Sequence, residues 1–202
     1  MRRTKEDAQV TRQIILDAAL RVFYLKGFSA TSINDICIEA GVTKGALYWH
    51  FESKELLFIE MLKENLQGII RLVEYYRNMN LEPDEKLKKI YTSIFEWIIQ
   101  NKNVHRAMDI LISKTEMRDI HLGEEEKKKK ELLLNFTDII QEGMEKGIFK
   151  NEMTPLQYNF YLNNVIAGLI WGAIEMPNMI KLAEWGPKYL QITFENILIV
   201  KK

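Results

Sequence analysis

The chain has 202 residues, of which 47% are hydrophobic and 28% charged, and its formal net charge is zero. This composition is typical of a protein that buries a sizeable core, and the net charge gives by itself no sign of a nucleic-acid partner. A single cysteine, Cys37, excludes an intrachain disulfide. The polar start lacks the apolar region of a signal peptide, and no apolar run is long enough to span a bilayer. We therefore expect a cytoplasmic protein with no membrane partner.

Helical periodicity dominates the chain, without convincing strand alternation or internal repeats, so we expect an all-α fold. The first helix is expected to begin near Asp7 or Thr11 and to end at Lys26. Gly27 follows at the position where a left-handed cap commonly ends a helix.

A short helix, a turn and a second short helix are expected next. Thr31 or Ser32 can cap the first of these helices, and an acidic residue lies three positions beyond Ser32. Gly41 is expected to end it, and Thr43 to cap a helix over residues 44–50. Two helices joined by a glycine-containing turn within about 20 residues are typical of a helix-turn-helix.

A long helix is expected from Ser53 to about Asn78, which spans close to 40 Å at about 1.5 Å per residue. Pro83 suits the first turn of a fifth helix, and a shorter sixth is expected over residues 104–114. The predicted core stripe of the fifth helix consists of Leu87, Ile90, Tyr91, Ile94, Phe95 and Ile98.

The next helix is expected to start at the charged run of residues 124–130 and to end at Gly147. In this run each Glu precedes a Lys by four positions, which is typical of a solvated helix face; an interaction tail is the alternative. The predicted buried side of this helix consists of Leu132, Leu133, Phe136, Ile139, Ile140 and Met144.

The last two predicted helices are the most apolar ones. One is expected from Thr154–Pro155 to Met176, before Pro177, and the other over residues 185–200, with Pro187 in its first turn. A helix that is apolar nearly all round needs burial on more than one side, and a second subunit can provide it.

Residues 31–36 (TSINDI) and 40–51 (AGVTKGALYWHF) resemble the DNA-binding domain of the TetR family of transcriptional repressors. The match extends to residues 3–9, 11–15 and 54–57, and its strong part covers about residues 3–60. The N-terminal motif and the Tyr-Trp-His-Phe ending are most similar to the AcrR branch, the local repressors of multidrug efflux operons. A fainter similarity remains at residues 110–116.

This resemblance implies a three-helix DNA-binding head in residues 1–54, joined by the long helix to a six-helix body in residues 55–202. The body would bind a small lipophilic effector and form a homodimer through its last two helices. The implied function is ligand-responsive repression at double-stranded, pseudo-palindromic operator DNA, with an efflux operon as the regulated target. An activator or constitutive DNA binder without a ligand is the alternative, as is a helical ligand-binding protein that does not act on DNA.

The third predicted helix carries hydrogen-bond donors and no acidic residue, which suits a phosphate backbone. Lys44 could reach a guanine edge, and Gly45 permits close backbone approach. In the alternative, Tyr48 and Trp49 belong to the head core and His50 is a surface residue. The residues expected to contact DNA are Thr31, Ser32, Thr43, Lys44, Gly45, Tyr48, Trp49, His50 and Lys54. Arg2, Arg3 and Lys5 form either a basic arm or a disordered terminus.

Large soft side chains in the body, with two polar groups, would suit a lipophilic and even cationic ligand. The candidates are Phe95, Trp97, Met108, Ile112, Phe136, Tyr161, Asn164, Trp171 and Glu175. Ordinary core packing is the alternative for each, and the cavity itself is implied mainly by the resemblance.

No catalytic arrangement stands out, so we expect neither an enzyme nor a cofactor. The three histidines, His50, His105 and His121, lack the spacing of metal ligands. Cys37 is expected to be a small buried hydrophobic residue, with a redox sensor as the alternative.

Overall fold

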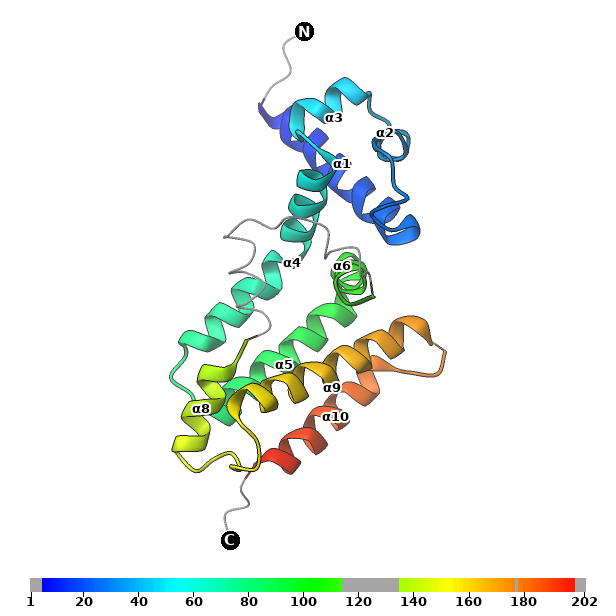
Figure 1. The fold of residues 1–202 in the computed structure, drawn as a ribbon. Coiled ribbons are helices and arrows are strands. Elements are labelled where there is room, and N and C mark those ends of the chain that lie inside the picture. Colours follow the sequence, from blue (N-terminus) through cyan, green and yellow to red (C-terminus); the bar gives the residue numbers. More distant parts are fainter. Residues whose placement is uncertain (1–4, 114–134, 177, 199–202) are drawn as a thin grey trace. The chain divides into compact units, whose positions relative to one another are not determined.

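The computed structural model describes residues 5–113, 135–176 and 178–198, and this part of the chain confirms the all-α fold (Figure 1). A single β-bridge, between Phe149 and Leu198, is the only strand-like pairing among these residues. The helices are α1 (Lys5–Lys26), α2 (Ile33–Ala40), α3 (Lys44–His50), α4 (Lys54–Asn78), α5 (Pro83–Gln100), α6 (Lys102–Ser113), α8 (Thr137–Glu145), α9 (Pro155–Glu175) and α10 (Leu182–Ile197).

Contacts divide the chain into two compact units. One, here called the head unit, comprises Met1–Gln67 and Asn103–Leu122; the other, the body unit, comprises Gly68–Lys102 and Gly123–Lys202. The helix α4 runs without a break through the point of division. The predicted functional boundary between residues 54 and 55 remains a prediction.

Several predicted features lie outside the described residues. These are Arg2 and Arg3 of the basic arm, the charged run 124–130, Leu132, Leu133, His121 and Pro177, together with the side chains of Lys5 and Ile112. Among the described helices, none is long and apolar enough to cross a membrane.

The helix ends in the head unit follow from local capping. Gly27 and Gly41 have φ values of 79° and 66°, the left-handed conformation that ends a helix most easily at glycine. Ser32, rather than Thr31, caps α2: its Oγ accepts a hydrogen bond from the amide of Asp35 at 3.1 Å. The Asp35 carboxylate accepts one from the Ser32 amide at 2.9 Å, which completes a capping box.

Asp35, which is paired with Lys26 and belongs to the capping box, makes the head unit sensitive to acid. The pKa of Asp35 is held well below its ordinary 3.8 by the ammonium of Lys26, then by the Ser32 amide and hydroxyl. Because the folded state resists protonation of this carboxylate, its stabilising effect is present above the ordinary pKa and is lost as pH falls below it. In urea unfolding between pH 5 and about 2.5, Asp35→Asn should therefore lose less stability than the wild type. An equally steep loss in both proteins would contradict this expectation.

In the body unit, α5 packs on α8 and α10, and α9 packs on α8 and α10. All six residues of the predicted α5 stripe are buried, which confirms the helical period read from the sequence. Pro83 is at the first position of α5, and Pro155, preceded by Thr154, begins α9, both as expected. Thr154 also forms a capping box with Gln157, which was not predicted from the sequence.

Two helix predictions are wrong. The helix expected from residues 124–130 to Gly147 does not continue across residues 135–136, because Phe136 has non-helical torsion angles (φ −117°, ψ 20°) and α8 begins at Thr137. The last helix begins at Leu182, not at residue 185, and Pro187 lies inside it. The buried Leu182 and Gly186 explain this early start, since their contacts favour continuing the helix across the proline.

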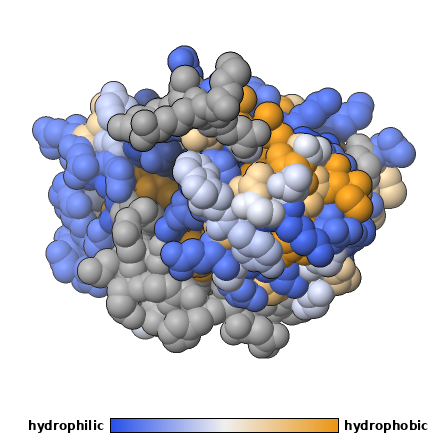
Figure 2. Space-filling model, turned by 90° about the horizontal axis from the view of Figure 1, so that it is seen from above, coloured by the Kyte–Doolittle hydropathy of each residue, from blue (hydrophilic) through white to orange (hydrophobic). Residues whose placement is uncertain are grey.

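Large apolar side chains remain exposed on the last two helices. On the face of the molecule seen in Figure 2, hydrophobic residues gather on one side rather than spreading evenly. The exposed large apolar residues of α9 and α10 are Leu156, Phe160, Trp171, Tyr189 and Ile192.

Candidate nucleic-acid interface

One glycine and one threonine build the turn between α2 and α3. The amide of Gly41 donates to the carbonyl oxygens of Cys37 and Ile38, which closes α2. The Oγ1 of Thr43 accepts a hydrogen bond from the amide of Ala46 at 3.2 Å, which opens α3. The chain therefore reverses between two capped helix ends, as a helix-turn-helix requires.

The helix α3 has one buried and one exposed face. Leu47 is fully buried and Phe51, at the C-cap, nearly so, whereas Tyr48 is 51% and Trp49 73% exposed. The half-buried His50 packs its ring edge-to-face with Trp49, with centroids 4.5 Å apart. Tyr48 and Trp49 are therefore not core residues of the head unit, which removes the alternative reading of this pair.

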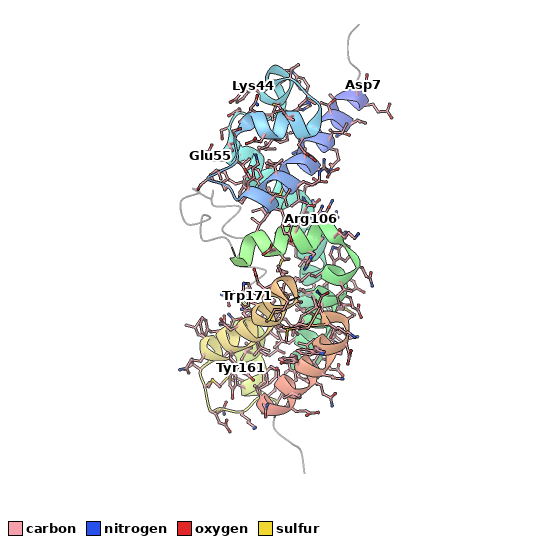
Figure 3. All side chains as sticks on the ribbon, turned by 90° about the vertical axis from the view of Figure 1, so that its right-hand side faces the viewer. Asp7, Lys44, Glu55, Arg106, Tyr161 and Trp171 are labelled. Carbon is pink, nitrogen blue, oxygen red and sulfur yellow. The ribbon has the colours of Figure 1, made fainter. Side chains whose placement is uncertain are left out.

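The start of α3 is also open to solvent. Thr43, Lys44 and Gly45 are exposed, and a Cβ at Gly45 would have only the Oγ1 of Thr43 nearby, at 3.9 Å. Figure 3 shows Lys44 at the end of the head unit where α1 begins, which is marked by Asp7. Residues 41–51 contain no acidic side chain, so this face offers cationic and neutral donors to a phosphate backbone.

Ser32 and Thr31, two of the residues predicted to contact DNA beside α3, differ in their exposure to solvent. Ser32 is exposed at the N-cap of α2. Thr31, by contrast, is 2% exposed, and its hydroxyl donates to the carbonyl oxygen of Gly27 at 2.6 Å. The hydroxyl of Thr31 is thus engaged within the loop between α1 and α2 rather than directed outward.

Lys54 fastens this loop to the start of α4. Its Nζ donates to the carbonyl oxygens of Phe28 and Thr31 at 2.9 and 3.0 Å and lies 4.3 Å from the centroid of the Phe28 ring. Phe28 in turn stacks in a cluster with Phe23 and Phe58. Two of the three ammonium N–H groups are therefore used inside the head unit.

A second contact, which was not predicted from the sequence, joins α1 to α4. Arg12 forms an ion pair with Glu60 at 2.8 Å, and Lys63 bonds the other oxygen of Glu60 at 2.9 Å. The guanidinium of Arg12 also lies 5.4 Å from the centroid of Phe51. Arg12 therefore covers the residue that ends α3, and only the folded pairing of α1 with α4 could have revealed this role.

Cys37 is buried as expected, and burial raises the pKa of its thiol, which keeps the unreactive protonated form. Within the described ranges, no group of three or more His, Cys, Asp or Glu side chains is arranged to hold a metal ion.

The predicted ligand-lining residues have unlike surroundings. Phe95 and Phe136 are buried in the body unit, and Tyr161 is half-buried on α9. Trp97 is partly exposed and packs on α4, where a Cβ at Gly68 would meet its ring at 2.3 Å.

The remaining candidates are less enclosed. Asn164, Trp171 and Glu175 are exposed on α9, and the Asn164 amide donates to the Phe160 carbonyl of the same helix at 2.7 Å. Figure 3 shows Tyr161 and Trp171 well apart along α9. Met108 is half-buried in the other unit. A common ligand-lining role for this set remains a prediction.

Comparisons with known proteins agree with the geometry of the head unit. Residues 15–61 match the family described as bacterial regulatory proteins, tetR family. The HTH-type transcriptional regulator AcrR of Shigella flexneri is 31% identical over 205 residues, covering 98% of this chain and 94% of AcrR.

Solved structures share the fold over nearly the whole chain. SmeT, the repressor of the Stenotrophomonas maltophilia multidrug efflux pump SmeDEF, gives a TM-score of 0.76 at 22% identity, covering 96% of this chain and 93% of SmeT. A complex of SmeT with triclosan gives 0.76 at 21% identity, covering 95% and 93%. NalD, the secondary repressor of the MexAB-OprM multidrug efflux pump in Pseudomonas aeruginosa, gives 0.73 at 26% identity, covering 96% and 100%.

The match to AcrR extends far beyond the helix-turn-helix, which itself has the capped turn and exposed α3 face that DNA binding requires. The chain therefore belongs to the TetR family of bacterial transcriptional regulators, within its AcrR-like branch.

Proposed function

We propose that this protein is a homodimeric repressor that a small lipophilic ligand releases from a pseudo-palindromic operator. The observation that carries the proposal is the α3 face, where Lys44, Tyr48 and Trp49 are exposed while Leu47 anchors the helix from below. Two such helices, one from each subunit, would enter major grooves about 34–36 Å apart or at a multiple of that spacing.

The side chains of α3 suit separate tasks on DNA. Lys44 is the candidate for a guanine edge or a phosphate, while Tyr48 and Trp49 donate to phosphates or pack on sugars. His50 and the remaining N–H of Lys54 add donors beside them. Ser32 and Thr43 belong to the helix starts next to the DNA backbone, and Gly45 lets the backbone approach closely.

The homodimer is supported by the apolar side chains exposed on α9 and α10. Leu156 and Phe160 are one helical turn apart on α9, and Trp171 extends the same helix toward its end. Tyr189 and Ile192 add exposed apolar surface on α10. A four-helix bundle of these helices from two subunits would remove this surface from water.

The ligand response is supported by the relatives. SmeT and NalD are repressors of multidrug efflux pumps, and the structure of SmeT has been solved in complex with triclosan. We therefore place an efflux operon under this regulator, with a ligand that binds the body and prefers the state unable to bind DNA. Calorimetry with triclosan and with lipophilic cations tests whether the body binds such a ligand. Operator binding that none of them weakens would favour the activator or constitutive alternative.

Lys44→Ala tests DNA binding directly. Its affinity for an operator selected with the wild type from random duplexes should fall about tenfold, and the slope of log affinity against log salt should decrease by about 1. The reason is that the substitution removes one cation from the exposed face of α3 and leaves the buried face intact. Fluorescence anisotropy with labelled duplex measures both quantities.

The matched control is Lys89→Ala, which removes an exposed lysine of α5 in the body unit. Its operator affinity and salt slope should equal those of the wild type. Equal affinity of Lys44→Ala and Lys89→Ala would count against the α3 face as the DNA contact. A wild type that binds no duplex even at low salt would favour a ligand-binding protein that does not act on DNA.

A further inference from the structure

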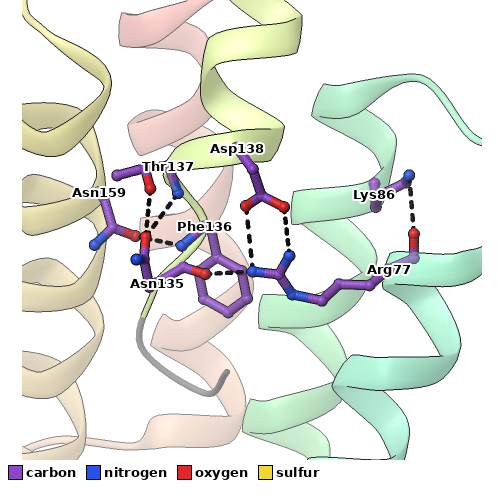
Figure 4. A network of polar contacts seen from close by, with 7 residues as sticks. All are labelled: Arg77, Lys86, Asn135, Phe136, Thr137, Asp138 and Asn159. Atoms are coloured by element: carbon purple, nitrogen blue, oxygen red, sulfur yellow. Dashed lines mark hydrogen bonds and ion pairs between the residues drawn. The ribbon is translucent and has the colours of Figure 1, made fainter. Parts of the chain in front are cut away.

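Four helices of the body unit meet around one arginine, Arg77, in the last turn of α4 (Figure 4). Its guanidinium points to the start of α8, where Nη1 lies 2.6 Å from one carboxylate oxygen of Asp138 and Nη2 3.2 Å from the other. Nη2 also donates to the carbonyl oxygen of Asn135. One planar cation therefore holds both a side chain and the backbone of the segment that opens α8.

The backbone of Arg77 is held as well. Its carbonyl oxygen is among the last four of α4, which have no partner within the helix, and it accepts a hydrogen bond from Nζ of Lys86 on α5 at 3.1 Å. The end of α4 is thus attached to α5 through its backbone and to α8 through its side chain.

Beneath the guanidinium lies Phe136, fully buried, with its ring centroid 5.4 Å from the central carbon of Arg77. The Phe136 amide donates to Oδ1 of Asn159 on α9 at 2.9 Å, and its ring packs edge-to-face with Tyr91 of α5. The hydroxyl of Tyr91 reaches Oδ1 of Asn163 on α9 at 3.2 Å. Arg77 therefore rests on a residue that is itself fixed by two further helices.

This arrangement is costly if stability is its only purpose. The Arg77 side chain is 18% exposed, and its Nε is buried without a hydrogen-bond partner among the described residues. Because Asp138 is 65% exposed, the ion pair itself adds little stability, while the buried Nε without a partner costs some. What a hydrophobic side chain cannot reproduce is the directional contact with Asp138 and Asn135, which fixes one orientation of the end of α4.

We infer that Arg77 is a positioning residue for DNA binding. It fixes the end of α4 on the body unit, and the continuous helix extends from there to Lys54, directly after the helix-turn-helix. This inference rests on the proposed function. Without the guanidinium, α4 samples several orientations, and only a fraction of dimers presents its two α3 helices at the operator spacing. Apparent operator affinity falls in proportion to that fraction.

The test compares Arg77→Met with Arg71→Met, which removes an exposed arginine of the same helix. Arg77→Met should weaken binding to the selected operator about tenfold, if about a tenth of the dimers remain competent. Binding to non-specific duplex should stay within about twofold, because each head keeps its own phosphate contacts. Arg71→Met should match the wild type on both duplexes.

Two further measurements separate positioning from general damage. The thermal midpoint of Arg77→Met should shift by no more than about 4 °C, a small change for a chain of this size. Amide hydrogen exchange should accelerate in the last turn of α4 and remain unchanged in α3. Arg77→Lys, which keeps the charge but not the planar fork, should recover only part of the operator affinity.

Asp138→Asn provides a milder variant in case Arg77→Met does not fold, because Asp138 is 65% exposed and tolerates the change. It should weaken operator binding in the same direction. Operator affinity of Arg77→Met, or of Asp138→Asn in its place, within about twofold of Arg71→Met would overturn the inference. A wild type that fails to prefer any duplex would instead refute the proposed function itself.

Discussion

Replacing Leu47 with alanine should destabilise the head unit by about 2–5 kcal/mol, the usual cost of removing a fully buried leucine side chain. Leu47 is 0% exposed, and α3 is only seven residues long. Isolated helices of that length do not persist in water, so α3 depends on this burial for its structure. Urea unfolding followed by circular dichroism should show an early transition, and operator binding should be lost in parallel.

The adjacent residue supplies the control. Tyr48→Ala removes a larger side chain from the same helix, but one that is 51% exposed, so the free energy of unfolding should change by only about 0.5 kcal/mol. Operator affinity should nevertheless fall, because Tyr48 belongs to the proposed DNA-contacting face. If Tyr48→Ala unfolds as early as Leu47→Ala, the division of α3 into an anchoring and a contacting face is wrong.

Gly143→Ala should destabilise the body unit by about 3 kcal/mol, near the upper end of the usual cost of overpacking. A Cβ at Gly143 of α8 would lie 2.3 Å from Cδ2 and 2.4 Å from Cε2 of the Phe149 ring, and 3.1 Å from Cβ of Pro83. Phe149 is 1% exposed, so its ring has no free space into which to move. The thermal unfolding midpoint, measured by calorimetry, should fall accordingly.

Gly45→Ala is the matched control, because Gly45 is also helical but has no close neighbour at its missing Cβ. Alanine favours a helix over glycine by up to about 1 kcal/mol, so this variant should be neutral or slightly stabilised. Equal midpoints for Gly143→Ala and Gly45→Ala would show that the Phe149 ring can yield, contrary to the tight packing described here.

Features that depend on neighbours along the chain were predictable. The left-handed caps at Gly27 and Gly41, the N-cap at Thr43 and the α5 stripe all follow from residues within a few positions of one another. Each is decided by local torsion angles, local hydrogen bonds or helical period, so the sequence carries the full information for it.

Features that depend on partners far along the chain were not predictable. Arg77 and Asp138 are 61 positions apart, and nothing in the periodicity of α4 marks Arg77 as a contact. The same holds for Gly68 against Trp97 and for Lys54 against the Phe28 carbonyl. In these cases the residue type permits the role, but only the packing of two helices assigns it.

The break before α8 and the early start of α10 have a related cause. Phe136 fits the apolar period of the following helix, yet tertiary contacts with Asn159 and Tyr91 hold it just outside that helix. Pro187 by itself predicts the first turn of a helix, because proline favours that position. Burial of Leu182 extends the helix past it, at the loss of one backbone hydrogen bond.

The four tryptophans of this chain are divided between the head unit and the body unit, so their fluorescence can report on each unit separately. Of the four, Trp49 lies on the exposed face of α3, whereas Trp97, Trp171 and Trp185 lie on α5, α9 and α10 of the body unit. Indole emission responds to the polarity and stacking partners of its immediate surroundings. Emission from Trp49 is therefore expected to change on the proposed contact with DNA, and emission from the other three tryptophans is expected to change with events in the body unit. The intrinsic tryptophan fluorescence of the protein can therefore follow both the proposed DNA binding and changes in the body unit, the two events that a regulator of this kind has to connect.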